Sequence, residues 1–151
     1  MPKTKSQSPI QQAELLLHLY ELRRETVMRQ ARSYVGGAQF QPHSADDLID
    51  SIKRGDQQTA YILQVFGYWD MLCAFVLHGA LTEALVYDTC QEMYFQWAKI
   101  QPHLKTFRAE MNLPEWMQSI ERVIDKSPKG RRRIASMQAS AKAFSARPPK
   151  P

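Results

Sequence analysis

Residues 57–81 read QQTAYILQVFGYWDMLCAFVLHGAL and form the most apolar stretch of the chain. Asp56, just before it, is a typical helix N-cap, and Gly79 suits the left-handed residue that follows a helix. Between them, apolar residues occupy nearly every side of a helical wheel, which is typical of a buried helix. The sequence therefore predicts a central helix over residues 57–78. Its only charged residue is Asp70.

The flanking segments show helical periodicity as well, and none has the alternating pattern of a strand. Further helices are expected near residues 9–35, 45–54, 83–111, with a kink at Pro102, and 113–126. Gly79 is expected at positive φ, where it would join 57–78 to 83–111 as an antiparallel hairpin. We therefore predict an all-α fold: a single compact bundle of about five helices around a central apolar helical hairpin. This domain spans residues 1–127.

Two apolar rows run along the predicted helix 9–35. The first holds Ile10, Ala13, Leu17, Tyr20 and Val27, with Arg24 in the position that the spacing leaves for an apolar residue. The second holds Leu15, Leu16, Leu19 and Leu22 and widens the apolar face. An amphipathic helix of this kind packs one face on a core and leaves the other in water.

Charge is distributed unevenly along the 151 residues, whose net charge is +5. Residues 1–34 carry six Lys or Arg and three Glu, so their net charge is +3. Residues 35–127 carry seven Lys or Arg against twelve Asp or Glu, net −5, and residues 128–151 carry seven Lys or Arg and no acid, net +7. The acidic body would repel a polyanion, so the basic composition does not indicate a whole-domain nucleic-acid binder.

The two cysteines and the N-terminal residues indicate the cellular compartment in which the protein is expected. Cys73 and Cys90 lie in apolar helical patterns without metal-site or redox spacing, which indicates buried thiols in a reducing cytosol. The first residues lack the apolar core of a signal peptide, and Met71–Leu81 is shorter than the roughly 20 residues that cross a bilayer. We expect a cytoplasmic protein without a membrane span.

Residues 128–151, here called the basic segment, differ from the body in composition. They are rich in Ala, Ser, Lys, Arg and Pro, yet Ile134, Met137, Ala141 and Phe144 keep helical spacing. We expect a marginal helix near residues 130–144 and a disordered end. The residues expected to contact a partner are Lys129, Arg131, Arg132, Arg133, Ile134, Met137 and Phe144. The apolar stripe could instead fold back on the acidic body, but the junction at Pro128 and Gly130 favours a partner.

Three carboxylates are candidates for a pocket. Asp88 and Glu92 are four residues apart, so on one continuous helix they share a face, as paired acid–base or cation-binding carboxylates do. Asp70 stands among apolar residues and needs a donor, for which Arg24 is the leading candidate. A solvated acidic stripe and a structural ion pair explain the same residues without any ligand.

Catalytic motifs are absent: the sequence has no phosphate-binding glycine loop, nucleophile elbow, zinc helix or kinase signature. We accordingly assign no catalytic residue, no metal ligand and no cofactor, and an enzymatic role is the less favoured class.

One stretch resembles a known family. The residues that carry the resemblance are Phe66, Val76–Leu81, Leu85–Asp88, Trp97, Pro102, Arg108 and Pro114, in that order. Over residues 58–126 the chain is similar to a bacterial family of helical domains of unknown function. The resemblance implies a helical fold and no known activity, substrate or cofactor. Many members carry an N-terminal membrane-spanning helix, whereas the corresponding segment here is amphipathic and contains several arginines.

The sequence thus favours a non-enzymatic protein-interaction module, with an acidic helical body and a basic segment that docks on an acidic protein partner. One alternative is a ligand- or metal-binding protein or enzyme that uses Asp70 or Asp88 and Glu92. A second is nucleic-acid association through the basic segment. The sequence also leaves a homo-oligomer open.

Overall fold

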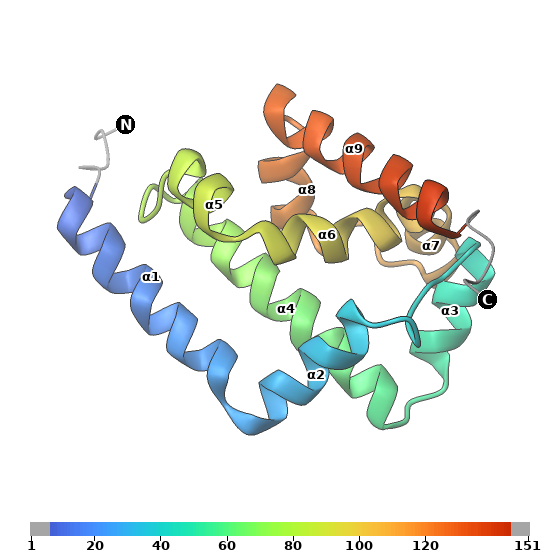
Figure 1. The fold of residues 1–151 in the computed structure, drawn as a ribbon. Coiled ribbons are helices and arrows are strands. Elements are labelled where there is room, and N and C mark those ends of the chain that lie inside the picture. The colour runs from blue at the N-terminus through green and yellow to red at the C-terminus, as the bar shows by residue number, and fades with distance from the viewer. Residues whose placement is uncertain (1–6, 146–151) are drawn as a thin grey trace, which may run out of the picture.

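The computed structural model describes residues 7–145, which contain helices and turns and no strand (Figure 1). In chain order the elements are α1 (Pro9–Arg24), α2 (Thr26–Gly36), α3 (Ala45–Lys53), α4 (Gln57–Leu77), α5 (Glu83–Thr89), α6 (Gln91–Ile100), a 3-10 turn η1 (Gln101–His103), α7 (Leu104–Met111), α8 (Gln118–Ile124) and α9 (Pro128–Ser145). The predicted all-α, compact fold is confirmed.

Polar caps set the beginnings of four helices. Ser8 Oγ accepts the amide of Gln11 at 3.2 Å while the Gln11 side chain accepts the amide of Ser8, which completes a capping box for α1. The side chains of Ser44, Asp56 and Thr82 each accept one amide in the first turn of α3, α4 and α5. Each cap satisfies a backbone amide that the first helical turn leaves unpaired. These four starting points match the sequence pattern.

Helix α4 forms the centre of the core and packs chiefly against α2 and α8. It also pairs with α6, through Phe66 against Trp97, Trp69 against Gln96 and Cys73 against Met93. From Phe66 to Cys73 the residue numbers rise along α4, while those of their partners fall from Trp97 to Met93 along α6. The two helices therefore run antiparallel. Gly79, at φ +83°, begins the reversal between them. The predicted positive φ is confirmed.

Helix α4 also has the length and composition of a membrane-crossing helix, and within residues 7–145 it alone does. In this fold its side chains form the core, where Ile62, Val65, Phe66, Trp69 and Leu72 are fully buried. Length and apolar composition are shared by core helices and spanning helices, so this feature does not assign the chain to a membrane.

The structure divides two of the predicted helices and shortens a third. The predicted helix 9–35 breaks at Glu25, whose ψ of 145° is extended, and the predicted helix 83–111 breaks at Cys90 as well as at the 3-10 turn around Pro102. The predicted helix 113–126 begins only at Gln118. Asn112, expected to cap it, instead ends α7 in the left-handed conformation. The breaks at Glu25 and Cys90 coincide with no proline, whereas the segment 112–117 contains Pro114.

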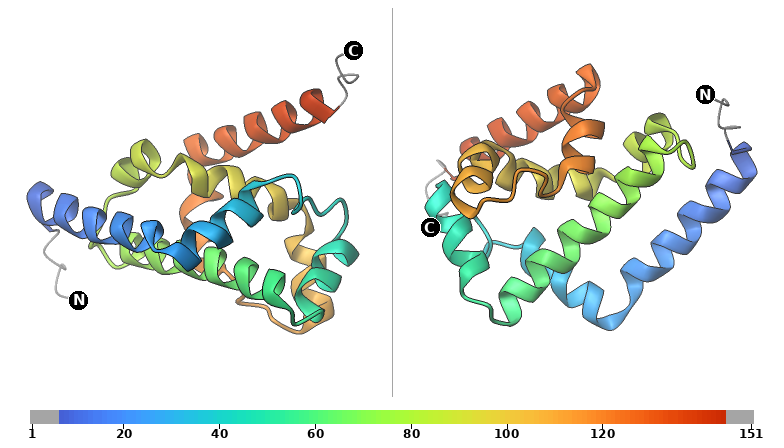
Figure 2. Two further views of the ribbon diagram at one scale, coloured as in Figure 1. Left: turned by 60° about the horizontal axis from the view of Figure 1, so that its bottom comes forward. Right: turned by 180° about the vertical axis from the view of Figure 1, so that it is seen from behind.

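The basic segment forms α9 and lies along α6, so the expectation that its apolar stripe is left for a partner, instead of folding back on the body, is wrong for its described part (Figure 2). Ser127 Oγ accepts the amide of Gly130 at 3.2 Å and caps the helix at the expected junction. Gly130 permits a close approach, because a Cβ there would lie 2.3 Å from the carbonyl oxygen of Ile124. Ile134 is 4% exposed. The junction is therefore packed tightly instead of being flexible.

Candidate functional site

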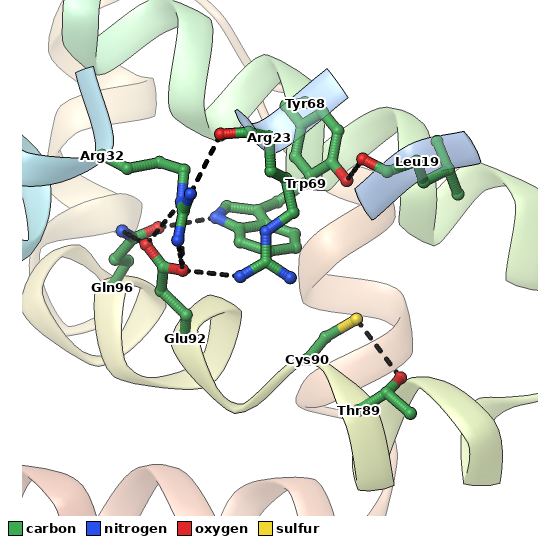
Figure 3. Close-up of polar contacts among 9 residues, drawn as sticks. All are labelled: Leu19, Arg23, Arg32, Tyr68, Trp69, Thr89, Cys90, Glu92 and Gln96. Atoms are coloured by element: carbon green, nitrogen blue, oxygen red, sulfur yellow. Dashed lines mark hydrogen bonds and ion pairs between the residues drawn. The ribbon is translucent and has the colours of Figure 1, made fainter. Parts of the chain in front are cut away.

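The most extensive polar cluster centres on Glu92, at the start of α6, where two arginines from α1 and α2 converge (Figure 3). Arg32 binds the carboxylate with both ends of its guanidinium fork, with Nε 2.9 Å from Oε1 and Nη2 2.6 Å from Oε2. Arg23 Nη2 lies 2.7 Å from Oε2. The three side chains are partly to largely buried, at 25%, 23% and 10% exposure for Glu92, Arg32 and Arg23. Charge-assisted bonds of this geometry are the strongest in proteins.

A second layer of hydrogen bonds fixes Glu92 to the core. Gln96 Nε2 donates to Glu92 Oε1 at 2.9 Å, and Gln96 Oε1 accepts the indole N–H of Trp69 at 2.6 Å. Gln96 and Trp69 are fully buried. Arg23 also stacks over the Trp69 ring, with its guanidinium carbon 5.1 Å from the ring centroid. The cluster thus joins α1, α2, α4 and α6.

The same cluster supports the break between α1 and α2. Arg32 Nη1 donates to the backbone oxygen of Arg23 at 3.0 Å, a carbonyl that the break at Glu25 leaves without its helical partner. Nearby, the Tyr68 hydroxyl donates to the carbonyl of Leu19 at 2.5 Å. Sequence reasoning found Glu92 but not Arg23, Arg32 or Gln96, because their meeting depends on a bend that no proline or glycine marks.

Electrostatics keep Glu92 ionised. Burial alone would raise the pKa of the Glu92 carboxyl, but the hydrogen bonds and charges of Arg32 and Arg23 outweigh burial, so its pKa is lowered. The hydrogen bond to Glu92 likewise raises the pKa of Arg32. A carboxylate saturated by two guanidiniums has no tendency to take up a proton near neutral pH. Glu92 therefore stabilises the fold and is poorly suited to act as a general base.

The other two candidate carboxylates lie outside this cluster. Asp88 is exposed on α5, and the break at Cys90 removes the continuous helix that would place it beside Glu92. Asp70 Oδ1 accepts the backbone amide of Ile120 at 3.1 Å. The expected pairing of Asp70 with Arg24 is wrong: Arg24 is exposed, and the buried cation is its neighbour Arg23, which faces Glu92.

Asp70 instead completes the start of α8. Ile120 is in the first turn of that helix, whose N-cap residue Met117 offers no side-chain hydrogen bond. A carboxylate from α4 thus accepts an amide that α8 leaves unpaired. Within residues 7–145, no group of three or more His, Cys, Asp or Glu side chains is arranged to hold a metal ion.

The two cysteines are free and buried, as predicted. Cys90 is 2% exposed, its Sγ lies 3.6 Å from Thr89 Oγ1, and burial raises the pKa of its thiol. Cys73 Sγ lies 3.5 Å from the Met93 sulfur, and burial raises its pKa as well. Raised pKa values disfavour the reactive thiolate, so both residues are packing elements.

The candidate residues of the basic segment divide into an inner and an outer set. Ile134 and Met137 pack on the core. Arg133 lies over the Tyr87 ring, 3.4 Å from its centroid, and donates to the Tyr87 carbonyl at 2.5 Å; Lys129 lies over the same ring at 4.6 Å. These four residues hold α9 to the body. Phe144 belongs to the last turn of α9, and its side chain lies outside the described residues.

Arg131 and Arg132 form the outer set. Both are exposed, and Arg131 Nη1 donates to the carbonyl of Asp125 at 2.7 Å. Arg122 and Lys126 are also exposed, on α8 and on the turn before α9. We call these four residues, Arg122, Lys126, Arg131 and Arg132, the cationic edge. Within residues 7–145, none of them forms an ion pair with a carboxylate.

The acids of the same stretch are occupied elsewhere. Glu121 forms an ion pair with Arg108, which also donates to the Trp116 carbonyl. Asp125 Oδ1 accepts from the Trp97 indole at 3.4 Å, and burial raises the pKa of Asp125. Both carboxylates line a groove of about 580 Å³ between α7 and α8. Among the described residues neither carboxylate forms an ion pair with the cationic edge, although the charge of Arg131 acts on Asp125 and opposes the effect of burial on its pKa.

A second, wider groove of about 890 Å³ lies between α2 and α4. Its lining is mostly neutral and polar, with Gln30, Ser33, Gln39, Gln58 and Tyr61 among its residues and Arg29 as its only charge. The Tyr61 hydroxyl lies 3.4 Å from Gln30 Oε1, at the long end of hydrogen bonding. This groove contains none of the residues that the sequence singled out.

Comparison with known proteins gives one match. The model of a family described as a domain of unknown function (DUF4760) matches residues 8–127, which comprise α1 to α8 and stop just before α9. No curated protein and no solved structure matches the chain.

Proposed function

This chain belongs to the DUF4760 family, a domain of unknown function, and we propose that it is a non-enzymatic interaction module that binds an acidic segment of a partner protein. The observation that carries the proposal is the cationic edge, four exposed cations gathered where α8 meets α9. Unpaired surface charges of one sign attract a complementary surface and raise the rate of encounter.

The packing of α9 determines how such a partner would bind. Ile134 and Met137 pack on the core, so they are not available for an apolar contact with a partner. The outward residues of α9 include Arg131, Arg132, Lys142 and several small Ala and Ser side chains. Guanidinium groups bind carboxylates through two parallel hydrogen bonds, and this geometry favours a Glu- or Asp-rich segment as the ligand.

An acidic protein segment is a better ligand than a nucleic acid for two reasons. Residues 35–127 carry a net charge of −5, which repels a long polyanion but leaves a short acidic segment free to bind at one edge. Base stacking needs an exposed aromatic ring, and Tyr87, which lies beside these cations, is already covered by Arg133 and Lys129.

We favour this module over a ligand- or metal-binding protein or enzyme that uses Asp70, or Asp88 with Glu92. Asp70 accepts the Ile120 amide, Glu92 is bound by Arg23, and Asp88 is exposed. We extend the proposal to the cytoplasm, since two buried free thiols, Cys73 and Cys90, suit a reducing compartment.

Fluorescence anisotropy with a labelled Glu-rich peptide and a labelled DNA duplex tests the proposal. We expect the peptide to bind in a salt-dependent way and more tightly than the duplex. Reversing two charges of the edge, Arg131→Glu with Arg132→Glu, removes about 3 kcal/mol or more of attraction if both arginines contact the peptide. The matched control, Lys53→Glu with Lys105→Glu, changes the net charge equally at exposed sites elsewhere. Equal losses in the two double variants, or preference for the duplex, would contradict the proposal.

A further inference from the structure

Helix α1 lies at one edge of the molecule, antiparallel to α4 (Figures 1 and 2). Only one of its sides contacts the body. Gln12 Oε1 accepts the amide of Thr82 at 3.0 Å, the Leu19 carbonyl accepts the Tyr68 hydroxyl, and Arg23 reaches Glu92. Its three buried residues, Gln12, Leu19 and Arg23, all belong to this inner side.

A neighbouring side of α1 is exposed and carries apolar residues, and at its border the guanidinium carbon of Arg23 lies 5.2 Å from the centroid of the Tyr20 ring. Ile10 is 72% exposed, Leu17 64% and Tyr20 52%. These three residues, with Ala13 and Arg24, form the outer row, in which successive members are three, four, three and four residues apart. This is the spacing of a two-helix coiled-coil seam. Single exposed apolar residues are ordinary, whereas a continuous row on a solvent-facing helix indicates a contact surface.

We propose that the outer row binds the outer row of a second copy of this chain, with the two α1 helices antiparallel. In this register Leu17 of each copy packs against Tyr20 of the other, and Arg24 packs against Ala13 of the other. Ala13 is small enough to leave room for the aliphatic part of an arginine side chain. The same contact then occurs twice about a two-fold axis, as in an isologous dimer.

Charge complementarity selects this partner and this direction. Arg24 is the only charged member of the outer row, and Glu14 follows Ala13 on the adjoining flank. An antiparallel pair brings Arg24 of one copy next to Glu14 of the other, twice, whereas a parallel pair would place the two Arg24 side chains together. Like charges opposed across a seam disfavour that arrangement.

The size of the surface sets the expected strength. Sixteen residues of α-helix extend about 24 Å, so the seam is only about two heptads long. A contact of this length falls among the small, transient interfaces. We therefore expect a reversible dimer in the micromolar range or weaker, which depends on protein concentration.

Sedimentation velocity of the full chain, from roughly 1 μM to about 1 mM, tests the proposal. We expect the monomer to convert to a dimer as concentration rises, and Leu17→Lys to weaken association at least tenfold without lowering Tm, since Leu17 is exposed in the monomer. The control Leu113→Lys alters a 41% exposed leucine in the α7–α8 turn and leaves association unchanged. A chain that stays monomeric over the whole range would overturn the proposal.

A charge exchange tests the register. Arg24→Glu and Glu14→Arg each weaken association roughly tenfold, and the double variant restores it, because the two opposite charges have only changed places. A double variant whose association is weakened by the product of the single effects would overturn the antiparallel register. The cationic edge is unaltered in these variants, so binding of the acidic peptide is unaffected by either outcome.

Discussion

Arg32 and Glu92 lie sixty residues apart in the sequence and form a bidentate ion pair, with Nη2 and Oε2 2.6 Å apart. The pair links α2 to α6, and through Arg23 it also includes α1. At the bend between α1 and α2, this ion pair takes the place of apolar packing.

Replacing Glu92 with Gln leaves Arg23 and Arg32 partly buried without a counter-charge. We expect Glu92→Gln to lower the free energy of unfolding by about 2–3 kcal/mol at pH 7, less than for a fully buried pair because the Glu92 side chain is 25% exposed. The lowered pKa of Glu92 stabilises the fold above about pH 4.3, the pKa of an unfolded glutamate, and this contribution is lost as the pH falls through the folded value.

Urea denaturation of both proteins from pH 7 to pH 2 measures this. The difference in free energy of unfolding between the wild type and Glu92→Gln narrows below about pH 4.3, because Glu92 becomes protonated. Asp88→Asn, which removes an exposed carboxylate, changes the stability by less than about 0.5 kcal/mol. A difference that stays constant down to pH 2 would show that the Glu92 charge is not responsible.

Lys99 closes the end of α2 by donating to the carbonyls of Val35, Gly37 and Phe40 at 2.8, 2.9 and 2.9 Å. Lys99→Met removes these donors, so we expect a loss of about 1–3 kcal/mol in chemical denaturation at pH 7. The exposed control Lys105→Met has little effect. A Lys99→Met protein as stable as the wild type would mean that water replaces the ammonium without cost.

The pH dependence of Lys99 has a defined sign. Burial lowers the pKa of Lys99 to about 8 from its ordinary value of 10.5. Between these values the unfolded chain holds more protons than the folded chain, so the wild type gains stability relative to Lys99→Met as the pH rises from 8 to 10.5. Denaturation curves of the two proteins across this range test the sign, and a relative loss of stability would contradict it.

Two glycines in helices give opposite predictions for the same substitution. At Gly130 a Cβ would lie 2.3 Å from the backbone oxygen of Ile124, so Gly130→Ala forces α9 away from α8 and costs about 2 kcal/mol or more. At Gly67 nothing lies within 4 Å of an added Cβ, so Gly67→Ala stabilises α4 by about 0.5–1 kcal/mol. Thermal unfolding of the two variants compares them directly, and equal shifts of Tm would contradict the close approach.

Asp70 provides a test of its role at α8. Asp70 is partly exposed and accepts a single backbone amide. We therefore expect Asp70→Ala to lower the free energy of unfolding by about 1 kcal/mol, as the loss of a helix cap does. Arg24→Ala leaves stability unchanged, and the double variant shows no coupling. A coupling energy above about 0.5 kcal/mol in this double-mutant cycle would restore the Arg24–Asp70 pair.

Local signals in the sequence predicted much of the fold. Ser8, Ser44, Asp56 and Thr82 cap helices through their own side chains, and Gly79 turns the chain because glycine tolerates positive φ. Each of these effects involves only neighbouring residues. The apolar wheel of residues 57–78 was equally informative, because a helix with no polar side has to be central.

The remaining features depend on contacts between distant residues. Helix α1 offers two apolar rows, and periodicity alone does not decide which one is buried; the structure buries Leu19 of the second row and exposes Leu17 of the first. The bend at Glu25 is supported by Arg32, seven residues later, and by Glu92. The observed ion pair differs from the predicted one in both members, with Arg23 in place of Arg24 and Glu92 in place of Asp70.

The way α1 is attached has a consequence for hydrogen exchange. Its inner side contacts the body through the buried Leu19 side chain and through polar contacts of Gln12, the Leu19 carbonyl and Arg23, while Ile10 and Leu17 of the outer row are exposed in the described residues. Such an element opens at a lower free energy than the global unfolding of the core. Amides of residues 13–24 will therefore exchange as one early cooperative unit, and exchange will quicken with added salt as the Arg23–Glu92 attachment is screened, while amides in α4 persist.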